Sequence, residues 1–362
     1  MHGHTTCLVC QHWAVKGDEM VAYISTSSLS KEVGHCSLCI HLSHRLPTMR
    51  SLVFGAAAAA LCSLAHGHPT SVKHQTIQAR QSDAYEGYLL AYFTASTLEG
   101  ETISFATSKG NNALQWIELN DGEPYITSAN GTGGLRDPFI IRAPDGSKTY
   151  LIATDLSIGS GTSWDEAVRN GSRYLEVWET EDLVNWSEQR HVLVSPPTAG
   201  NTWAPEAFYD TTIERYVVYW ASQLYNESDV NHTGDSYARM LYATTDDFVT
   251  FSEPQVWQDG GSAEAARIDS TVYQDEDSDV FYRFTKSEGG QGGCRDIIQE
   301  RSTNLRGNLS EWETVASCIG ENAGLGDLEG PDAFRSNPDD VNGDLYYLFV
   351  DEYIEGSKSW NI

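Results

Sequence analysis

Four short segments of the sequence each place a carboxylate at the start of a run of apolar, strand-forming residues, and a second such run follows each one. Equivalent strands repeated along a chain favour a radial arrangement in which every carboxylate points at one central axis. An axis lined in this way suits chemistry on a neutral substrate rich in hydroxyl groups. The segments are Arg136-Asp137-Pro138-Phe139, Trp203-Ala204-Pro205-Glu206, Arg267-Ile268-Asp269-Ser270 and Leu328-Glu329-Gly330-Pro331, and the second runs are Lys148–Asp155, Arg215–Ser222, Val280–Lys286 and Asp344–Asp351.

A second repeat runs in step with the first. A strand that ends in a polar turn is followed each time by an aromatic residue, at Trp116, Trp186, Phe251 and Trp312, with spacings of 70, 65 and 61 residues. Periods of this size with about four strands each predict the blades of a β-propeller. We therefore predict an all-β, five-bladed β-propeller in which residues 87–127 supply three strands, and in which the last blade and the closing strand are truncated.

The N-terminal part of the chain divides into three segments before the propeller. Residues 49–67 combine Met49 and Arg50 with an apolar stretch and small residues, which is typical of a secretory signal peptide. We expect residues 1–48 to be a spurious or disordered extension, residues 68–85 a linker and residues 86–362 the propeller domain. Export of this kind predicts a secreted, extracellular protein.

The cysteines separate into two sets. Cys7-x-x-Cys10 and Cys36-x-x-Cys39 have the form of zinc knuckles, but their wide separation favours a segment without metal, so we expect no metal and no cofactor. Beyond the signal only Cys294 and Cys318 remain, and two cysteines in an exported domain predict one disulfide. Six N-x-S/T sequons predict glycosylation; they begin at Asn130, Asn170, Asn185, Asn226, Asn231 and Asn308.

Charge and composition exclude several classes of partner. The formal net charge is -28, so the chain has little with which to neutralise phosphates, and neither nucleic acid nor an anionic membrane surface is an expected partner once the signal is removed. Aromatic residues make up 11% of the chain, which fits a β protein that stacks on sugar rings. We expect a monomer that binds an oligosaccharide or polysaccharide.

The order and spacing of the four motifs resemble glycoside hydrolase family 43, whose members include α-L-arabinofuranosidases, β-xylosidases, arabinanases and some galactanases. The resemblance covers roughly residues 86–355. It implies that Asp137 is the general base that activates water. It also implies that Asp269 orients the acid and raises its pKa, and that Glu329 is the general acid. Two carboxyl groups that face each other across a sugar can perform inverting hydrolysis in this way.

Four further residues are expected to contact the substrate. By the resemblance, Glu206 occupies a position that usually contacts substrate, although it could instead be the acid. Trp203 is a possible platform for a sugar ring, and core packing is an equal alternative. Arg283 and Asp155 lie near the ends of second strands, where they could reach substrate hydroxyls or form structural salt bridges.

The resemblance predicts a secreted, inverting glycosidase of plant cell-wall polysaccharide that releases α-L-arabinofuranose. A β-xylosidase or galactanase of the same family is the first alternative. The second is an inactive carbohydrate-binding propeller, because a ring without its closing strand would expose unpaired strand edges beside the pocket.

Overall fold

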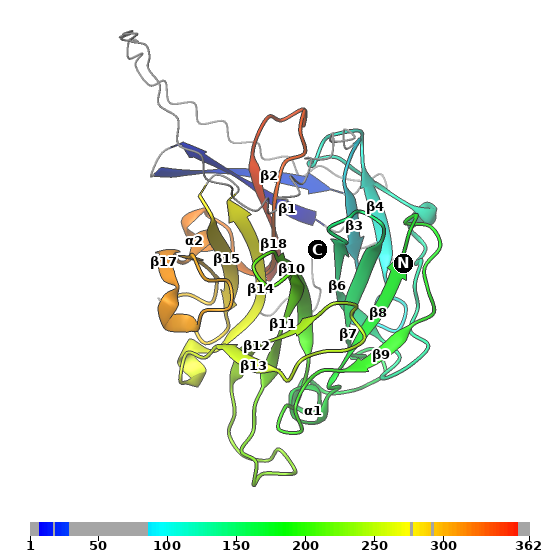
Figure 1. Cartoon of the computed structure of the whole chain (residues 1–362), viewed down its shortest axis with the longest axis vertical. Helices are drawn as coiled ribbons and strands as arrows, with labels where there is room; N and C mark the ends of the chain where they lie inside the picture. Colours follow the sequence, from blue (N-terminus) through cyan, green and yellow to red (C-terminus); the bar gives the residue numbers. More distant parts are fainter. Residues whose placement is uncertain (1–6, 17–18, 29–85, 276–277, 291–292, 354–362) are drawn as a thin grey trace, which may run out of the picture.

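The computed structural model describes residues 7–16, 19–28, 86–275, 278–290 and 293–353. They form an all-β fold in the arrangement of a β-propeller, with the inner strands gathered near the middle of the view in Figure 1. No helix among the described residues is long and apolar enough to cross a membrane. The segment expected to be a signal peptide, residues 49–67, lies outside the described residues.

The described residues form five sheets. Three follow the chain directly, with the strand orders β6-β7-β8-β9, β10-β11-β12-β13 and β14-β15-β16-β17. Their strands are β6 (Leu135–Arg142), β7 (Thr149–Asp155), β8 (Tyr174–Thr180), β9 (Arg190–Leu193), β10 (Trp203–Asp210), β11 (Arg215–Gln223), β12 (Ala238–Thr245), β13 (Gln255–Gln258), β14 (Arg267–Asp275), β15 (Val280–Ser287), β16 (Ile297–Ser302) and β17 (Glu313–Ala316). All neighbours within these sheets are antiparallel.

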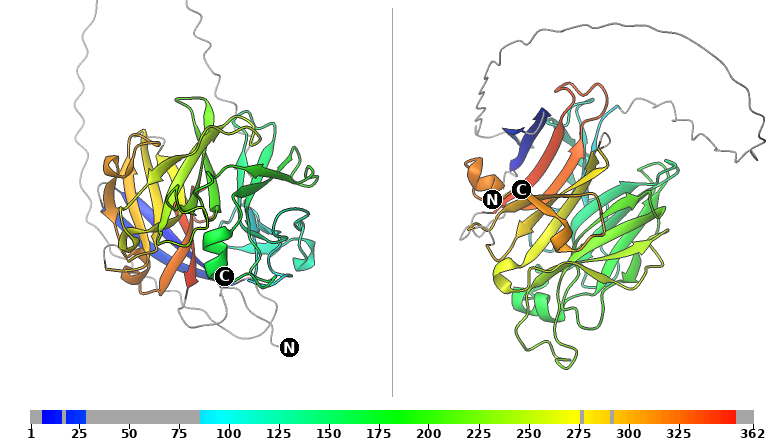
Figure 2. Two further views of the ribbon diagram at one scale, coloured as in Figure 1. Left: turned by 90° about the horizontal axis from the view of Figure 1, so that it is seen from below. Right: turned by 60° about the vertical axis from the view of Figure 1, so that its left-hand side comes forward.

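The other two sheets differ from this pattern. One has three strands in the order β3-β4-β5, and the other joins the two ends of the chain in the order β18-β19-β1-β2. Figure 2 shows the blue strands β1 and β2 beside the red end of the chain. The strands are β1 (Cys7–Lys16), β2 (Glu19–Ser28), β3 (Leu89–Tyr92), β4 (Ser104–Ser108), β5 (Trp116–Glu118), β18 (Asp327–Arg335) and β19 (Tyr346–Tyr353).

The number of full blades corrects the prediction. The described residues form four four-stranded blades, not five, and the remaining sector of the ring is the three-stranded sheet β3–β5. Short helical segments occupy some connections: α1 (Trp164–Asn170), α2 (Ile319–Asn322), η1 (Asn120–Gly122), η2 (Ala263–Ala265) and η3 (Leu309–Glu311).

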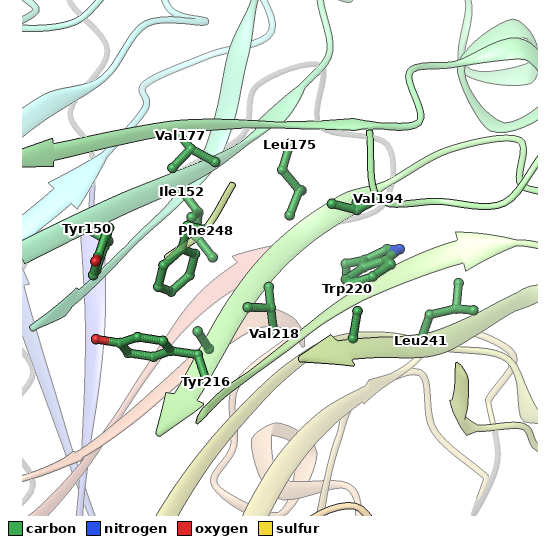
Figure 3. Packing of buried hydrophobic residues seen from close by; sticks show 12 residues of the cluster. Tyr150, Ile152, Leu175, Val177, Val194, Tyr216, Val218, Trp220, Leu241 and Phe248 are labelled. Carbon is green, nitrogen blue, oxygen red and sulfur yellow. The ribbon is translucent and has the colours of Figure 1, made fainter. Parts of the chain in front are cut away.

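Apolar clusters between successive sheets hold the ring together. Figure 3 shows the largest, in which Ile152 and Val177 of one sheet pack against Val218 and Trp220 of the next. Equivalent clusters fill the other junctions, and the last one packs Phe349 of β19 against the β3–β5 sheet, so the sheets close into a circle. Burial of this apolar surface is the main source of stability for such a ring.

The repeated aromatic residues take part in these junctions. Trp116, Trp186, Phe251 and Trp312 each follow the third strand of a blade or its counterpart, and each packs in a different cluster, toward the preceding sheet. Trp186, for example, stacks on Phe105 with ring centroids 5.5 Å apart. The 60- to 70-residue period therefore records one packing contact repeated around the ring.

Candidate active site

A shared backbone irregularity defines the inner end of four blades. The strands β6, β10, β14 and β18 each carry one extra residue where the pairing register shifts, between Arg136 and Phe139 in β6 and at the matching points of the others. The residue at this bulge has a positive φ in every case: Asp137 (46°), Ala204 (47°), Asp269 (44°) and Gly330 (55°). A bulge changes the direction in which the side chains at the end of a strand point. Here four bulges change it around one axis.

The bulge aligns the four motifs residue by residue. Asp137 and Asp269 occupy the positive-φ position itself, whereas Glu329 comes one residue before it and Glu206 two residues after it. The four carboxylates therefore do not occupy equivalent backbone positions. Asp332 is the counterpart of Glu206, because each lies two residues beyond its bulge.

The inner strands surround one cavity of about 520 Å³. Its lining includes the three acids to which the resemblance gives catalytic roles, Asp137, Asp269 and Glu329, and also the predicted contact residues Trp203 and Glu206. Asp155 and Arg283 are absent from the lining. Aromatic and charged side chains in the lining for which no role was predicted include Tyr92, Phe93, Arg136, Trp164, Lys286, Glu288, Arg295, Asp332, Phe349 and Asp351.

A hydroxyl group fixes the orientation of Asp137. Thr154 Oγ1 accepts a hydrogen bond from the Ala204 N–H at 2.8 Å, so its own hydrogen is free to donate to Asp137 Oδ2, also at 2.8 Å. Since Ala204 is the bulge residue of the next blade, this chain of two bonds ties neighbouring blades together beside the carboxylate. Asp137 is thereby held as an acceptor facing the cavity.

Asp269 and Glu329 hold protons more tightly than usual. Burial, followed by repulsion from Glu329 and Asp137, raises the pKa of Asp269 well above its usual range. Burial and the charge of Asp351 raise the pKa of Glu329 to about 8. Burial leaves the charged form of a carboxyl poorly solvated, and a like charge nearby adds to that cost.

The deeper acids follow the same rule. Burial and the nearby Asp332 raise the pKa of Glu206 well above its ordinary value, and Tyr219 donates a hydrogen bond to the Glu206 carboxylate at 3.3 Å. Burial alone raises the pKa of Asp332 to about 6. A pair of groups that both resist ionisation is more suited to holding a neutral hydroxyl than a bare charge.

One wall of the cavity is aromatic. The rings of Trp203 and Trp164 meet edge to face with centroids 6.0 Å apart, and Trp164 remains 43% exposed. Arg136 lies between this wall and Phe93, 4.5 Å from the Phe93 ring centroid, and forms a buried salt bridge with Glu101 at 3.1 Å. Flat apolar faces beside polar groups are the surfaces on which sugar rings stack.

Two of the predicted contact residues lie elsewhere and have structural partners. Arg283 is fully buried, forms a salt bridge with Glu300 at 2.7 Å and packs over Trp312. Asp155 accepts hydrogen bonds from the N–H and hydroxyl groups of Thr132, both at 2.7 Å.

Asp155 also belongs to a small group of ligand-type side chains outside the cavity. Its carboxylate lies near those of Glu176 and the ring of His191, with the three ligand atoms within 4.8 Å of one another. Gln189 and His191 both hydrogen-bond to Glu176, at 2.6 Å and 2.5 Å. These bonds join Glu176, Gln189 and His191 into a polar network within the blade, and Asp155 lies beside it.

A disulfide fixes the loop that carries Arg295 to the cavity rim. Cys294 and Cys318 are bonded, with Cα atoms 5.7 Å apart. On the same side, Lys286 Nζ donates to the Arg295 carbonyl at 2.6 Å, so the lysine that lines the cavity is held by this loop. The second C-x-x-C pair, Cys36 and Cys39, for which we expect no metal, lies outside the described residues.

A family described as a probable glycosyl hydrolase domain, related to glycoside hydrolase family 43, matches residues 83–360. The chain belongs to this family. It is also 35% identical over 299 residues to an α-L-arabinofuranosidase of Bifidobacterium longum subsp. longum, a match that covers 74% of this chain and 27% of that protein. The chain thus spans about a quarter of the length of this curated relative.

Solved structures with a similar chain path include an exo-1,5-α-L-arabinanase from a bovine ruminal metagenomic library, with 14% identity, a TM-score of 0.47 and coverage of 76% of this chain and 92% of that one. A second is the α-L-arabinanase of Cellvibrio cellulosa complexed with arabinohexaose, with 13% identity, a TM-score of 0.48 and coverage of 76% and 91%.

Proposed function

We propose that this protein is an inverting glycosidase that releases α-L-arabinofuranose from plant cell-wall polysaccharide. The observation that carries the proposal is the set of unequal acids in one cavity: Asp137, held by a hydroxyl donor, and Glu329, whose pKa burial and a neighbouring carboxylate raise to about 8. The relative from Bifidobacterium longum, an α-L-arabinofuranosidase, supports this choice of sugar.

The two acids would divide the chemistry between them. Asp137 takes a proton from a water molecule as the water oxygen attacks the anomeric carbon. Glu329 gives its proton to the glycosidic oxygen as the bond between that oxygen and the anomeric carbon breaks. Attack from the face opposite the leaving group inverts the anomeric centre, and Asp269 would hold the acid in place through the Gly330 N–H.

The test is turnover of 4-nitrophenyl α-L-arabinofuranoside, with Asp137→Asn and Glu329→Gln as variants. Each variant should lower kcat by a factor of about 10² to 10⁴, the usual contribution of a general acid or base. Asp339→Asn is the matched control, because Asp339 is exposed and lies outside the cavity in a positive-φ turn that asparagine tolerates. Proton NMR of the first product formed should show the inverted anomer.

Aryl β-xyloside and β-galactoside belong in the same panel, since preference for either would replace arabinose as the substrate. Turnover that neither variant reduces would contradict the assignment of the acids. Binding of arabino-oligosaccharide without turnover would instead support a carbohydrate-binding propeller.

We further propose that the protein is a secreted, glycosylated monomer. The asparagines of all six sequons are exposed, and the disulfide is of a kind that persists in oxidising compartments. Treatment of the exported protein with an endoglycosidase should lower its mass, and an unchanged mass would refute glycosylation.

A further inference from the structure

A further carboxylate of the cavity, that of Asp351, lies next to the proposed general acid. Asp351 is in β19 and pairs directly with Glu329 of β18 across the antiparallel ladder. Residues that face each other in this way point to the same side of a sheet, with Cβ atoms about 5 Å apart. Both side chains line the cavity.

The backbone between these two acids is shaped to let the second one approach. Gly330 follows Glu329 with a φ of 55°, and a Cβ added to it would lie 3.0 Å from Asp351 Oδ2. On its other side, the Gly330 N–H donates to Asp269 Oδ2 at 3.3 Å. Two carboxylates therefore flank the residue next to the general acid, one from the preceding blade and one from the same blade.

The charged groups that act on Glu329 come from four directions. Asp351 on β19 acts most strongly, followed by Lys286 at the end of β15, Glu288 just beyond it and Asp137 on β6, while Asp269 on β14 repels Glu329 in turn. Lys286 occupies in its blade the position that Asp351 occupies in the last one, because it pairs with Ile268 as Asp351 pairs with Glu329. Two equivalent register positions thus carry opposite charges beside one acid.

We propose that Asp351 is a positioning residue for the general acid, and that its carboxylate, opposed by Lys286, keeps the proton on Glu329 between catalytic cycles. The proposal rests on the proposed glycosidase function. Burial and the charges of Asp137 and Asp269 raise the pKa of Asp351 to about 7, and burial with the charge of Asp351 raises that of Glu329. Because the two carboxyls pair across one ladder position, an ionised Asp351 disfavours a second charge on Glu329.

The same arrangement would help the acid recover after each turnover. When Glu329 has given its proton to the leaving oxygen, two adjacent carboxylates are both ionised. Their repulsion favours return of a proton to Glu329, and the proton that Asp137 took from water is released to solvent. The balance is one proton gained at Asp137 and one lost at Glu329 in each cycle.

The experiment is the pH profile of kcat/KM on the aryl arabinofuranoside for the wild type, Asp351→Asn and Lys286→Met. Asp351→Asn should lower the pKa of the basic limb by roughly 1 unit, and Lys286→Met should raise it, because the two residues act on Glu329 with opposite sign. The rate of Asp351→Asn relative to the wild type should therefore fall as the pH rises, because the variant loses the proton of Glu329 at a lower pH. A merely structural role for Asp351 would lower the rate evenly at every pH.

Asp269→Asn is the matched comparison, since it removes the carboxylate on the other side of Gly330. A basic limb that moves with Asp269→Asn but not with Asp351→Asn would overturn the proposal. Carboxyl ¹³C NMR of the substrate-free protein gives a second readout that needs no turnover. If the Glu329 pKa falls in Asp351→Asn, the positioning role stands even where no glycoside is hydrolysed, and if it does not change, the role is refuted.

Discussion

Strand β14 contributes to two groups of buried charged side chains. The two groups differ in how the loss of water around their charges is compensated. Arg267 belongs to a cluster in which its guanidinium and that of Arg283 share the Glu300 carboxylate, at 2.8 Å and 2.7 Å, while Arg283 also lies 4.1 Å from the Trp312 ring centroid. Asp269, two residues further on, faces a cavity that is lined by seven carboxylates. The first group has a partner for every charge, and the second does not.

Within this one blade, the first group has a structural role and the second provides groups for acid–base chemistry. In the first group, opposite charges and an aromatic face compensate for the loss of water, so the cluster can be buried at a tolerable cost. In the cavity, the lack of compensation shifts the pKa values of Asp269 and Glu329 upward, which is what a general acid near neutral pH requires. The uncompensated carboxylates of the cavity therefore lower the free energy of unfolding, and packing in the rest of the ring must offset that loss.

The largest effect is expected from breaking the compensated group. Glu300→Gln leaves Arg267 and Arg283 buried with no negative charge between them, and it should lower the free energy of unfolding by about 3 to 5 kcal/mol. Chemical denaturation followed by tryptophan fluorescence would measure the loss. A loss below 1 kcal/mol would mean that the rings of Trp257 and Trp312, which lie 4.9 Å and 4.1 Å from the Arg283 guanidinium, stabilise this cluster more than Glu300 does.

Removing a charge from the second group, the acids of the cavity, should raise the free energy of unfolding instead of lowering it. Burial raises the pKa of Asp332 from 3.8 to about 6, so the native state binds this proton more tightly than the unfolded chain does. The stability from Asp332 is therefore complete below its unfolded pKa and is lost as the pH rises through about 6. Asp332→Asn removes this loss and should stabilise the protein by about 1 to 3 kcal/mol at pH 8.

The pH dependence is the control for that prediction. At pH 4 the native Asp332 is protonated, and the variant should then differ little from the wild type in its free energy of unfolding. Thermal unfolding at the two pH values tests both points together. A variant that is less stable at pH 8 would show that Asp332 has a compensating partner.

The sequence was most informative where a motif and a strand end coincide. Asp137, Asp269, Glu329, Trp203 and Glu206 all line the cavity, because each lies in a segment that opens an inner strand. Alignment of Trp203-Ala204-Pro205-Glu206 with Glu329-Gly330-Pro331-Asp332 would also have identified Asp332, since the proline marks the same step beyond the bulge.

The sequence predicted where the second strand of each blade lies. It did not predict which face of the sheet each side chain of that strand points to. Side chains alternate between the two faces of a strand, so an error of one residue reverses the result. Thr154, not Asp155, lies opposite the first motif residue of its blade, because Arg136 pairs with Thr154. In the next-but-one blade, Lys286 pairs with Ile268, which precedes its bulge as Arg136 precedes its own, whereas Arg283 had been expected to reach the substrate.

Asp351 was missed for a related reason. Its pairing with Glu329 depends on the bulge that follows Glu329, and a count of residues without that bulge would place a different side chain opposite the acid. The sequence pattern also could not predict the number of full blades, because β1 and β2 join β19 from a distant part of the chain. Strand pairs this far apart in sequence leave no local signature.

The smallest effect is expected from a charge pair at the surface. This pair tests whether burial, and not geometry, determines how much a charged group contributes to the free energy of unfolding. Arg215 and Asp246 form a two-bond pair at 2.9 Å and 3.0 Å, with geometry as good as that around Glu300 but with the Asp246 side chain 67% exposed. Asp246→Asn should lower the free energy of unfolding by about 0 to 1 kcal/mol, because water solvates both ions once they separate. Denaturation in low and high salt would measure it, and salt should reduce even this small loss. A loss as large as that of Glu300→Gln would show that good geometry, and not removal from water, makes a charge pair matter in this fold.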